Sequence, residues 1–279
     1  MVEPRPISPK SLVLDLLRVA PGAESVKGLC EVGALFGFTS NAVRVAVTRL
    51  VARGLVESDE RGSYRLAAVA NPRSDFVERW RLGDKRTRRW QGGWLSAWLP
   101  RGQPRAVRRR TLDALALLGF REGLAGVFVR PDNLAQSIED TRADAAGLGI
   151  ETGVELFVAG QFAAEVEQRF CASLWSAKAL TRRCRSAQRE LDESTERLDT
   201  MPVERAVVQT FIVGGQAIRV LATDPLLPDA VVDGAARREL TAAMLRYDAR
   251  GRRVWKRFVE ARQLQAAPVH LSLVHGGAA

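Results

Sequence analysis

The chain has 279 residues, of which 46% are hydrophobic, and its formal net charge is +10 at pH 7. The length allows two or three domains with cores of their own, and the hydrophobic content excludes a disordered chain. Runs of about 18 apolar residues, which a membrane span needs, do not occur. The start of the sequence has no apolar signal region, so we expect a cytoplasmic protein without membrane contact. Three widely spaced cysteines indicate neither a disulfide framework nor a metal site.

The positive charge is concentrated in one segment. Residues 71–121 contain thirteen basic and four acidic residues, a net charge of +9, whereas residues 122–200 have a net charge of −5. Nearly all of these basic residues are arginines, whose planar guanidinium groups bind phosphates well. The segment therefore indicates a polyanionic partner such as nucleic acid.

Residues 39–66 have the pattern of a helix followed by a basic hairpin. Thr39 or Ser40 is a candidate N-cap, and Gly54 is expected to end the helix. One apolar stripe recurs at i, i+3, i+4 and i+7, and consists of Val43, Ala46, Val47 and Leu50. Strands are expected at 55–56 and 64–66, joined by a turn at 61–63.

Two further helices are expected before this one, at 12–18 and 26–37. The order of helices, turn and hairpin predicts a winged helix-turn-helix, in which the third helix enters the major groove. On its exposed face, Asn41, Arg44 and Thr48 are expected to read base edges. The complete set of predicted DNA-binding residues is Ser40, Asn41, Arg44, Thr48, Arg49, Arg61 and Arg65, of which the last three are expected to hold phosphates.

The rest of the chain alternates between strands and helices and then becomes helical. Residues 73–90 form a basic connector that either lies on DNA or is a solvated linker helix. Strands are expected at 94–99, 124–129 and 154–158, with helices at 105–118 and 132–146, which predicts a small α/β sandwich. From residue 161 onward, helices are expected with a break near Trp175, then at 203–221 and 237–264.

Four short motifs follow one another along the chain. They are Ala42–Gly54, Trp90-Gln-Gly-Gly-Trp94 with the later Leu118-Gly-Phe120, Gly126-Val-Phe-Val-Arg-Pro131, and Asp224-Pro-Leu-Leu-Pro228. In these motifs the chain resembles the PaaX family of bacterial transcriptional repressors. The resemblance implies an α+β multidomain fold. Its expected parts are a winged helix-turn-helix (1–70), a basic linker (71–90), a ferredoxin-like central domain (91–172) and a helical C-terminal domain (173–279).

The resemblance also implies a mode of action. It implies a homodimeric repressor bound to a double-stranded operator, arranged as an inverted repeat, and released by an aryl- or acyl-CoA thioester such as phenylacetyl-CoA. Beyond this effector, no cofactor or metal is expected. A CoA ester needs apolar walls for its acyl group and arginines for its phosphates. The candidates on that chemistry are Trp94, Trp98, Arg130, Trp175 and Arg219.

Two alternatives remain open. A metal-dependent nuclease could use carboxylates of the central module, for which Asp113, Asp132 and Asp140 are available. A nucleoid-type protein could bind DNA by charge alone. Zinc spacings, a P-loop and a nucleophile elbow do not occur in the sequence, and both histidines, His270 and His275, lie near its end. We therefore do not expect an enzyme.

Overall fold

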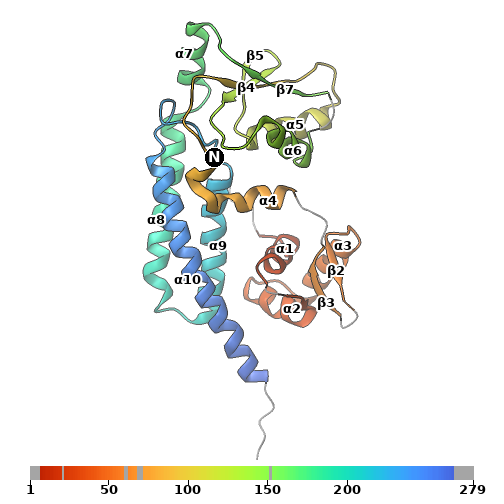
Figure 1. Ribbon diagram of the computed structural model, residues 1–279. Helices are drawn as coiled ribbons and strands as arrows, with labels where there is room; N and C mark the ends of the chain where they lie inside the picture. Colours follow the sequence, from red (N-terminus) through yellow and green to blue (C-terminus); the bar gives the residue numbers. More distant parts are fainter. Residues whose placement is uncertain (1–6, 21, 60–61, 68–71, 151–152, 267–279) are drawn as a thin grey trace, which may run out of the picture.

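The computed structural model describes residues 7–20, 22–59, 62–67, 72–150 and 153–266. Three parts follow one another along the chain: helices with a small sheet, a larger sheet with helices, and a group of long helices (Figure 1). The mixed α and β composition of the expected fold class is confirmed, whereas the division into domains stays a prediction. Arg61, His270 and His275 lie outside the described residues.

The N-terminal part consists of three helices and a three-stranded antiparallel sheet of order β1-β3-β2. Its elements are α1 (Pro9–Val19), β1 (Glu24–Ser25), α2 (Val26–Leu35), α3 (Ser40–Val51), β2 (Val56–Ser58) and β3 (Ser63–Leu66). Thr39 is the N-cap of α3, because its hydroxyl oxygen accepts a hydrogen bond from the Ala42 backbone N–H at 3.2 Å. The apolar stripe expected on α3 is confirmed, because all four of its residues are buried. Helix α3 contacts both α1 and α2.

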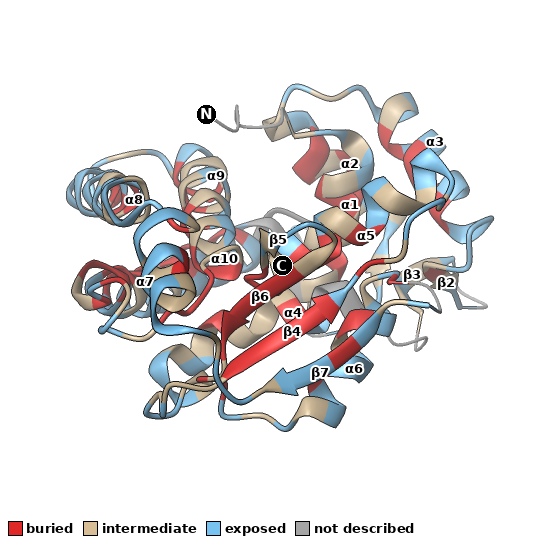
Figure 2. Cartoon of the chain, turned by 90° about the horizontal axis from the view of Figure 1, so that it is seen from above, coloured by how far each residue is buried: buried red, intermediate tan, exposed pale blue. Residues whose placement is uncertain are grey.

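The central part is a four-stranded antiparallel sheet of order β5-β6-β4-β7. Its elements are β4 (Trp94–Trp98), α5 (Arg105–Leu117), β5 (Arg121–Leu124), β6 (Val127–Pro131), α6 (Ile138–Gly147) and β7 (Glu155–Ala159). This βαββαβ order is that of a ferredoxin-like module. Figure 2 shows β4 and β6 as deeply buried strands, whereas β7 at the sheet edge is largely exposed.

Two expected elements of the central part differ from the structure. The single strand expected at 124–129 was wrong, because the chain reverses there between β5 and β6. Gly126 has a φ of +77° at this reversal, a conformation that glycine adopts without steric cost. The helix expected from Asp132 begins only at Ile138, since Ser137 and Asp140 form a capping box that fixes its first turn.

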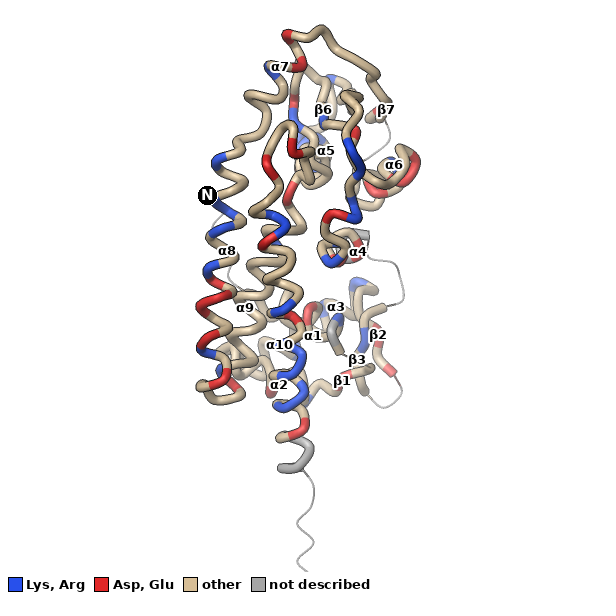
Figure 3. The backbone as a smooth tube through the Cα atoms, turned by 60° about the vertical axis from the view of Figure 1, so that its left-hand side comes forward, with Lys and Arg blue, Asp and Glu red and all other residues tan. Residues whose placement is uncertain are grey.

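The C-terminal part is helical, and the expected break near Trp175 is confirmed. Its helices are α7 (Ala164–Ser173), α8 (Ala177–Leu198), α9 (Val203–Ala222) and α10 (Ala235–Ala266). Most basic residues of α8 lie in its first half, and most of its acidic residues lie in its second half (Figure 3). The connector between the first two parts folds into α4 (Pro72–Glu78) and the 3₁₀ helix η1 (Arg79–Arg86), which contacts α9 and α10.

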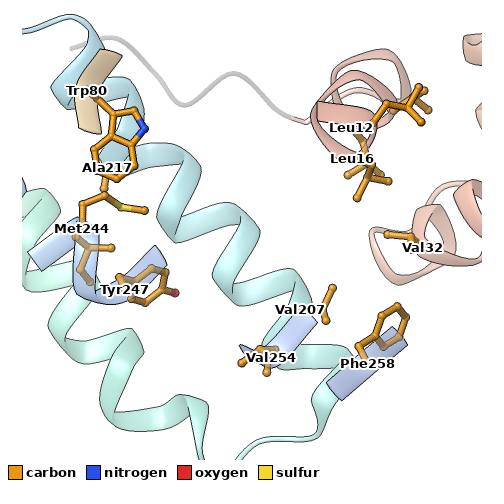
Figure 4. Packing of buried hydrophobic residues seen from close by; sticks show 14 of the residues in the cluster. Leu12, Leu16, Val32, Trp80, Val207, Ala217, Met244, Tyr247, Val254 and Phe258 are labelled. Atoms are coloured by element: carbon orange, nitrogen blue, oxygen red, sulfur yellow. The ribbon is translucent and has the colours of Figure 1, made fainter. Parts of the chain in front are cut away.

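One hydrophobic cluster extends through the N-terminal and C-terminal helices. Leu12 of α1 and Val32 of α2 belong to it, together with Val207 of α9 and Phe258 of α10 (Figure 4). Trp80 of η1 is only 1% exposed in the same cluster. The N-terminal part therefore packs on the long helices through a continuous apolar core.

Candidate nucleic-acid interface

The outward face of α3 carries the predicted base-reading residues. Asn41, Arg44 and Thr48 are all exposed, and they lie opposite the buried stripe because one helical turn takes 3.6 residues. The face belongs to the side of the molecule away from α8 and α10 (Figures 1 and 2). A helix presented in this way can enter a major groove, which is wide enough to admit an α-helix.

The cations of α3 are available to a ligand. Arg44 and Arg49 are exposed, and within the described residues neither has a carboxylate partner. The Thr48 hydroxyl donates a hydrogen bond to the Arg44 carbonyl oxygen at 3.1 Å, so its oxygen lone pairs remain free to accept. Ser40, at the start of the helix, is also exposed. All four predicted side chains reach solvent.

The hairpin residue Arg65 differs from this pattern. It lies on β3 and forms an ion pair with Glu57 of β2, with 3.3 Å between Arg65 Nη2 and Glu57 Oε2. The two side chains are 68% and 41% exposed, and exposed pairs of this kind contribute little stability. A phosphate can therefore compete with Glu57 for Arg65 at small energetic cost.

Val45 lies outside the predicted set although it is on the same face of α3. Val45 is 39% exposed and is one of the apolar residues at the surface. Small apolar side chains contact the methyl group of thymine in the major groove. The signal in the sequence was an apolar residue interrupting the polar face of an otherwise amphipathic helix.

Arginines of the basic connector are largely engaged within the protein. Arg79 Nη1 and Asp144 Oδ2 of α6 are 2.6 Å apart, and Arg81 Nη1 and Asp248 Oδ2 of α10 are 2.7 Å apart. Arg81 also lies over the Trp80 ring, with its guanidinium carbon 4.7 Å from the ring centroid. The sequence left two interpretations of this segment open, a solvated linker helix or an arm that lies on DNA. The paired arginines Arg79 and Arg81 fit neither interpretation. Through these ion pairs, the connector is joined both to the central part and to the long helices.

A buried arginine connects three of the four sequence motifs. Arg130 on β6 is 2% exposed and donates hydrogen bonds to the carbonyl oxygens of Leu118 and Pro225 and to the side chain of Asn133. Asn133 in turn donates to the Leu226 carbonyl oxygen at 2.7 Å. Burial lowers the pKa of Arg130 to about 9. Its contacts are with carbonyl and amide oxygens of the protein, so the side chain acts here as a structural bridge.

Two of the predicted effector tryptophans lie beside this bridge. The rings of Trp94 and Trp175 stack with centroids 6.5 Å apart and an interplanar angle of 17°. Trp94 donates to Glu167 at 3.1 Å and Trp175 donates to the Gly119 carbonyl oxygen at 3.3 Å. Trp94, Trp175 and Arg130 are thus brought together as tightly packed core residues.

The other two effector candidates lie elsewhere. Trp98, at the far end of β4, is 47% exposed, and Arg219 is an exposed residue of α9. A small cavity lies instead between α8, the 224–228 turn and the start of α10, where Cys184 and Arg237 contribute to its wall. Its volume of about 10 Å³ is close to what one water molecule needs. None of the five candidates lines it.

The three carboxylates that a nuclease could use do not form a common site. Asp132 pairs with Arg88 at 2.8 Å, Asp140 caps α6 through Ser137, and Asp113 is exposed on α5. Across the described ranges, three or more His, Cys, Asp or Glu side chains do not gather into a group able to hold a metal ion. The geometry therefore offers this alternative no support.

A membrane span would require a long apolar helix. Among the helices that the structure describes, none combines sufficient length with sufficient apolar character.

Comparison with known proteins supports the family resemblance of the N-terminal part. Residues 8–70 match the model of a family described as PaaX-like protein, which confirms the resemblance over α1 to β3. No curated protein matches the sequence. A solved structure, the uncharacterized protein Rv0674 from Mycobacterium tuberculosis, is 24% identical, covers 89% of this chain and 99% of its own, and superposes with a TM-score of 0.56. Because the match covers most of this chain, the two proteins share their fold over most of its length.

Proposed function

We propose, from the premise that residues 8–70 match the PaaX-like family, that the protein is a sequence-specific DNA-binding regulator of transcription, acting as a repressor. The observation that carries the proposal is the exposed face of α3, where Asn41, Arg44 and Thr48 project without carboxylate partners among the described residues. Asparagine pairs with adenine and arginine with guanine through two hydrogen bonds each. The face thus carries the chemistry that direct readout requires.

Other residues would hold the backbone of the same duplex. Arg49 lies at the edge of the base-reading face of α3, and Arg65 lies on the hairpin that follows α3. Phosphate contacts fix the register of the protein on DNA, whereas base contacts select the sequence. Arg61 completes this predicted set and lies outside the described residues. A homodimer would place two such units on an inverted repeat.

An aryl- or acyl-CoA ester is the effector that the family resemblance suggests. Trp94, Trp175 and Arg130 support a site near the junction of the central sheet and the long helices, because they combine aromatic surface with positive charge. Since these residues are tightly packed, binding there would require the junction to open. An ester that prefers the open conformer would lower DNA affinity by its coupling free energy.

The test is a fluorescence-polarisation titration of the protein on its own upstream DNA and on a scrambled duplex, at about 150 mM salt, with and without a panel of CoA esters. We expect tight binding to the upstream DNA alone, and release by one ester. Tight, specific binding that no ester changes would keep the DNA-binding function and contradict the effector. Equal weak binding to both duplexes would contradict the proposal and favour a protein that binds by charge alone.

A further inference from the structure

Four arginines gather where β4 leads into α5. Arg101 lies in the turn between these elements, and Arg105, Arg108 and Arg109 occupy the first two turns of α5. Arg101, Arg105 and Arg109 are exposed, and Arg108 is half-buried. Within the part of the chain that the structure describes, none of the four has a carboxylate partner. We call this set the α5 arginine cluster.

The positive charges of the α5 arginine cluster are electrostatically unfavourable for the helix that carries them. Arg105 is followed by Arg108 at i+3 and by Arg109 at i+4, and like charges at these spacings repel each other. The positive end of the helix dipole also disfavours cations in the first turn. Acidic residues are missing from that turn of α5, whereas α6 carries Glu139 and Asp140 at its start. A bound polyanion would remove this unfavourable charge.

The structure distinguishes the α5 arginine cluster from three arginines of the preceding connector. Arg79, Arg81 and Arg88 of the connector pair with Asp144, Asp248 and Asp132, respectively. Those cations hold the protein together, and their charge is compensated within it. For the α5 arginine cluster, by contrast, no ion pair with a carboxylate occurs among the described residues.

The position of α5 suits a duplex that is held by α3. Both helices lie on the side of the molecule away from α8, as two perpendicular views show (Figures 1 and 2). One turn of B-DNA spans about 34 Å, so a duplex in contact with α3 extends well beyond that helix. Guanidinium groups bind phosphate oxygens in a bidentate manner.

We infer that the α5 arginine cluster is a second DNA-binding surface, which holds the phosphate backbone of the duplex flanking the segment that α3 reads. The inference rests on the proposed DNA-binding function. It assigns the central part a direct role on DNA. This surface would raise affinity without any gain in sequence preference, because phosphates are the same in every sequence.

The test compares charge removal on α5 with the same change on the opposite side. Arg105→Gln/Arg109→Gln removes two cations at i and i+4. The matched control is Arg185→Gln/Arg189→Gln on α8, where two exposed arginines have the same spacing; basic residues of this half of α8 are visible in Figure 3. Binding to an operator duplex, extended by about ten base pairs at each end, is measured against salt concentration. Thermal unfolding of both variants checks that they are folded.

We expect the α5 variant to lower the slope of log Kd against log salt by about 2, at about 0.9 per phosphate contact, and to weaken binding on the order of tenfold at about 150 mM salt. The α8 variant should leave the slope unchanged. Arg105→Lys/Arg109→Lys, which keeps both charges, should keep most of the slope.

Three outcomes would overturn the inference. They are an unchanged slope in a folded α5 variant, an equal fall in the α8 variant, and a loss in the lysine variant as large as in the glutamine variant. A wild-type protein without operator preference would contradict the proposed function itself. Normal operator preference with an unchanged slope in the α5 variant would contradict only the second surface.

Discussion

Phe36, at the C-terminal end of α2, meets Phe211 of α9 edge to face, with ring centroids 5.1 Å apart and ring planes at 73°. The turn from α2 into α3 follows Phe36 directly. The contact therefore helps to set the position of α3, the proposed DNA-reading helix, relative to the long helices. We expect a rearrangement of those helices to change the position of α3.

This contact gives the first prediction. In a double-mutant cycle of Phe36→Ala and Phe211→Ala, the coupling free energy should be about 1 kcal/mol, because an edge-to-face pair contributes beyond its buried area. Urea denaturation of the wild type, both single variants and the double variant measures it. Val259→Ala on the exposed face of α10 is the control and should shift stability by less than about 0.5 kcal/mol. Strictly additive effects of the two phenylalanine changes would show that the rings do not interact.

The second prediction concerns the buried Arg130. Lysine lacks the planar guanidinium group of arginine. It therefore cannot donate hydrogen bonds to the carbonyl oxygens of Leu118 and Pro225 and to Asn133 at the same time. Arg130→Lys should therefore lower the free energy of unfolding by about 2–4 kcal/mol, since buried acceptors and a buried cation lose partners. Thermal or urea unfolding measures the loss, and Arg109→Lys at the surface should change little. Equal stability of the two variants would contradict the bridging role.

The third prediction concerns acid stability. Burial raises the pKa of Asp248, but hydrogen bonds from Arg81 and Arg252 outweigh it and hold the pKa below its ordinary 3.8. Because this folded-state pKa lies below the unfolded one, the pair stabilises the protein above about pH 4, and the contribution is lost as the pH falls through the lower folded-state value. Asp248→Asn should therefore be less stable than the wild type at pH 7, and the two stability curves should converge toward pH 2.

Urea midpoints of both proteins between pH 7 and pH 2 measure this convergence. Asp233→Asn is a suitable control, since the Asp233 side chain is 79% exposed in its ion pair and should show only a small effect. A difference between Asp248→Asn and the wild type that stays constant over the whole range would contradict the titration of this carboxylate.

The features that the sequence predicted correctly are those that depend on neighbouring residues. The buried stripe of α3 and its cap at Thr39 follow from helical periodicity and from a hydroxyl at the first turn, both of which are local. The hairpin at Gly126 was missed, because an apolar residue, Leu124, precedes the reversal and extends the strand pattern across it. Periodicity alone cannot place a tight turn inside an apolar run.

Contacts between distant segments could not be predicted. Arg79 and Arg81 lie 65 and 167 residues from their carboxylate partners, and the sequence contains nothing that links those positions. The same holds for Arg130, which is brought to the 224–228 turn only by the tertiary fold. The sequence showed which arginines are chemically suited to bind phosphate. Their burial and their ion pairs, which only the fold reveals, decide which of them are accessible to a ligand.

The most direct test of the central claim is Arg44→Ala on α3. If Arg44 reads a guanine edge, the variant should lose about 1–3 kcal/mol of operator binding, about 5- to 150-fold in Kd, and much less on a scrambled duplex. Fluorescence polarisation on both duplexes at the same salt concentration measures this difference, with Arg185→Ala on α8 as the control. A loss on operator DNA that greatly exceeds the loss on scrambled DNA is the predicted result. Equal losses on the two duplexes would contradict sequence reading by α3.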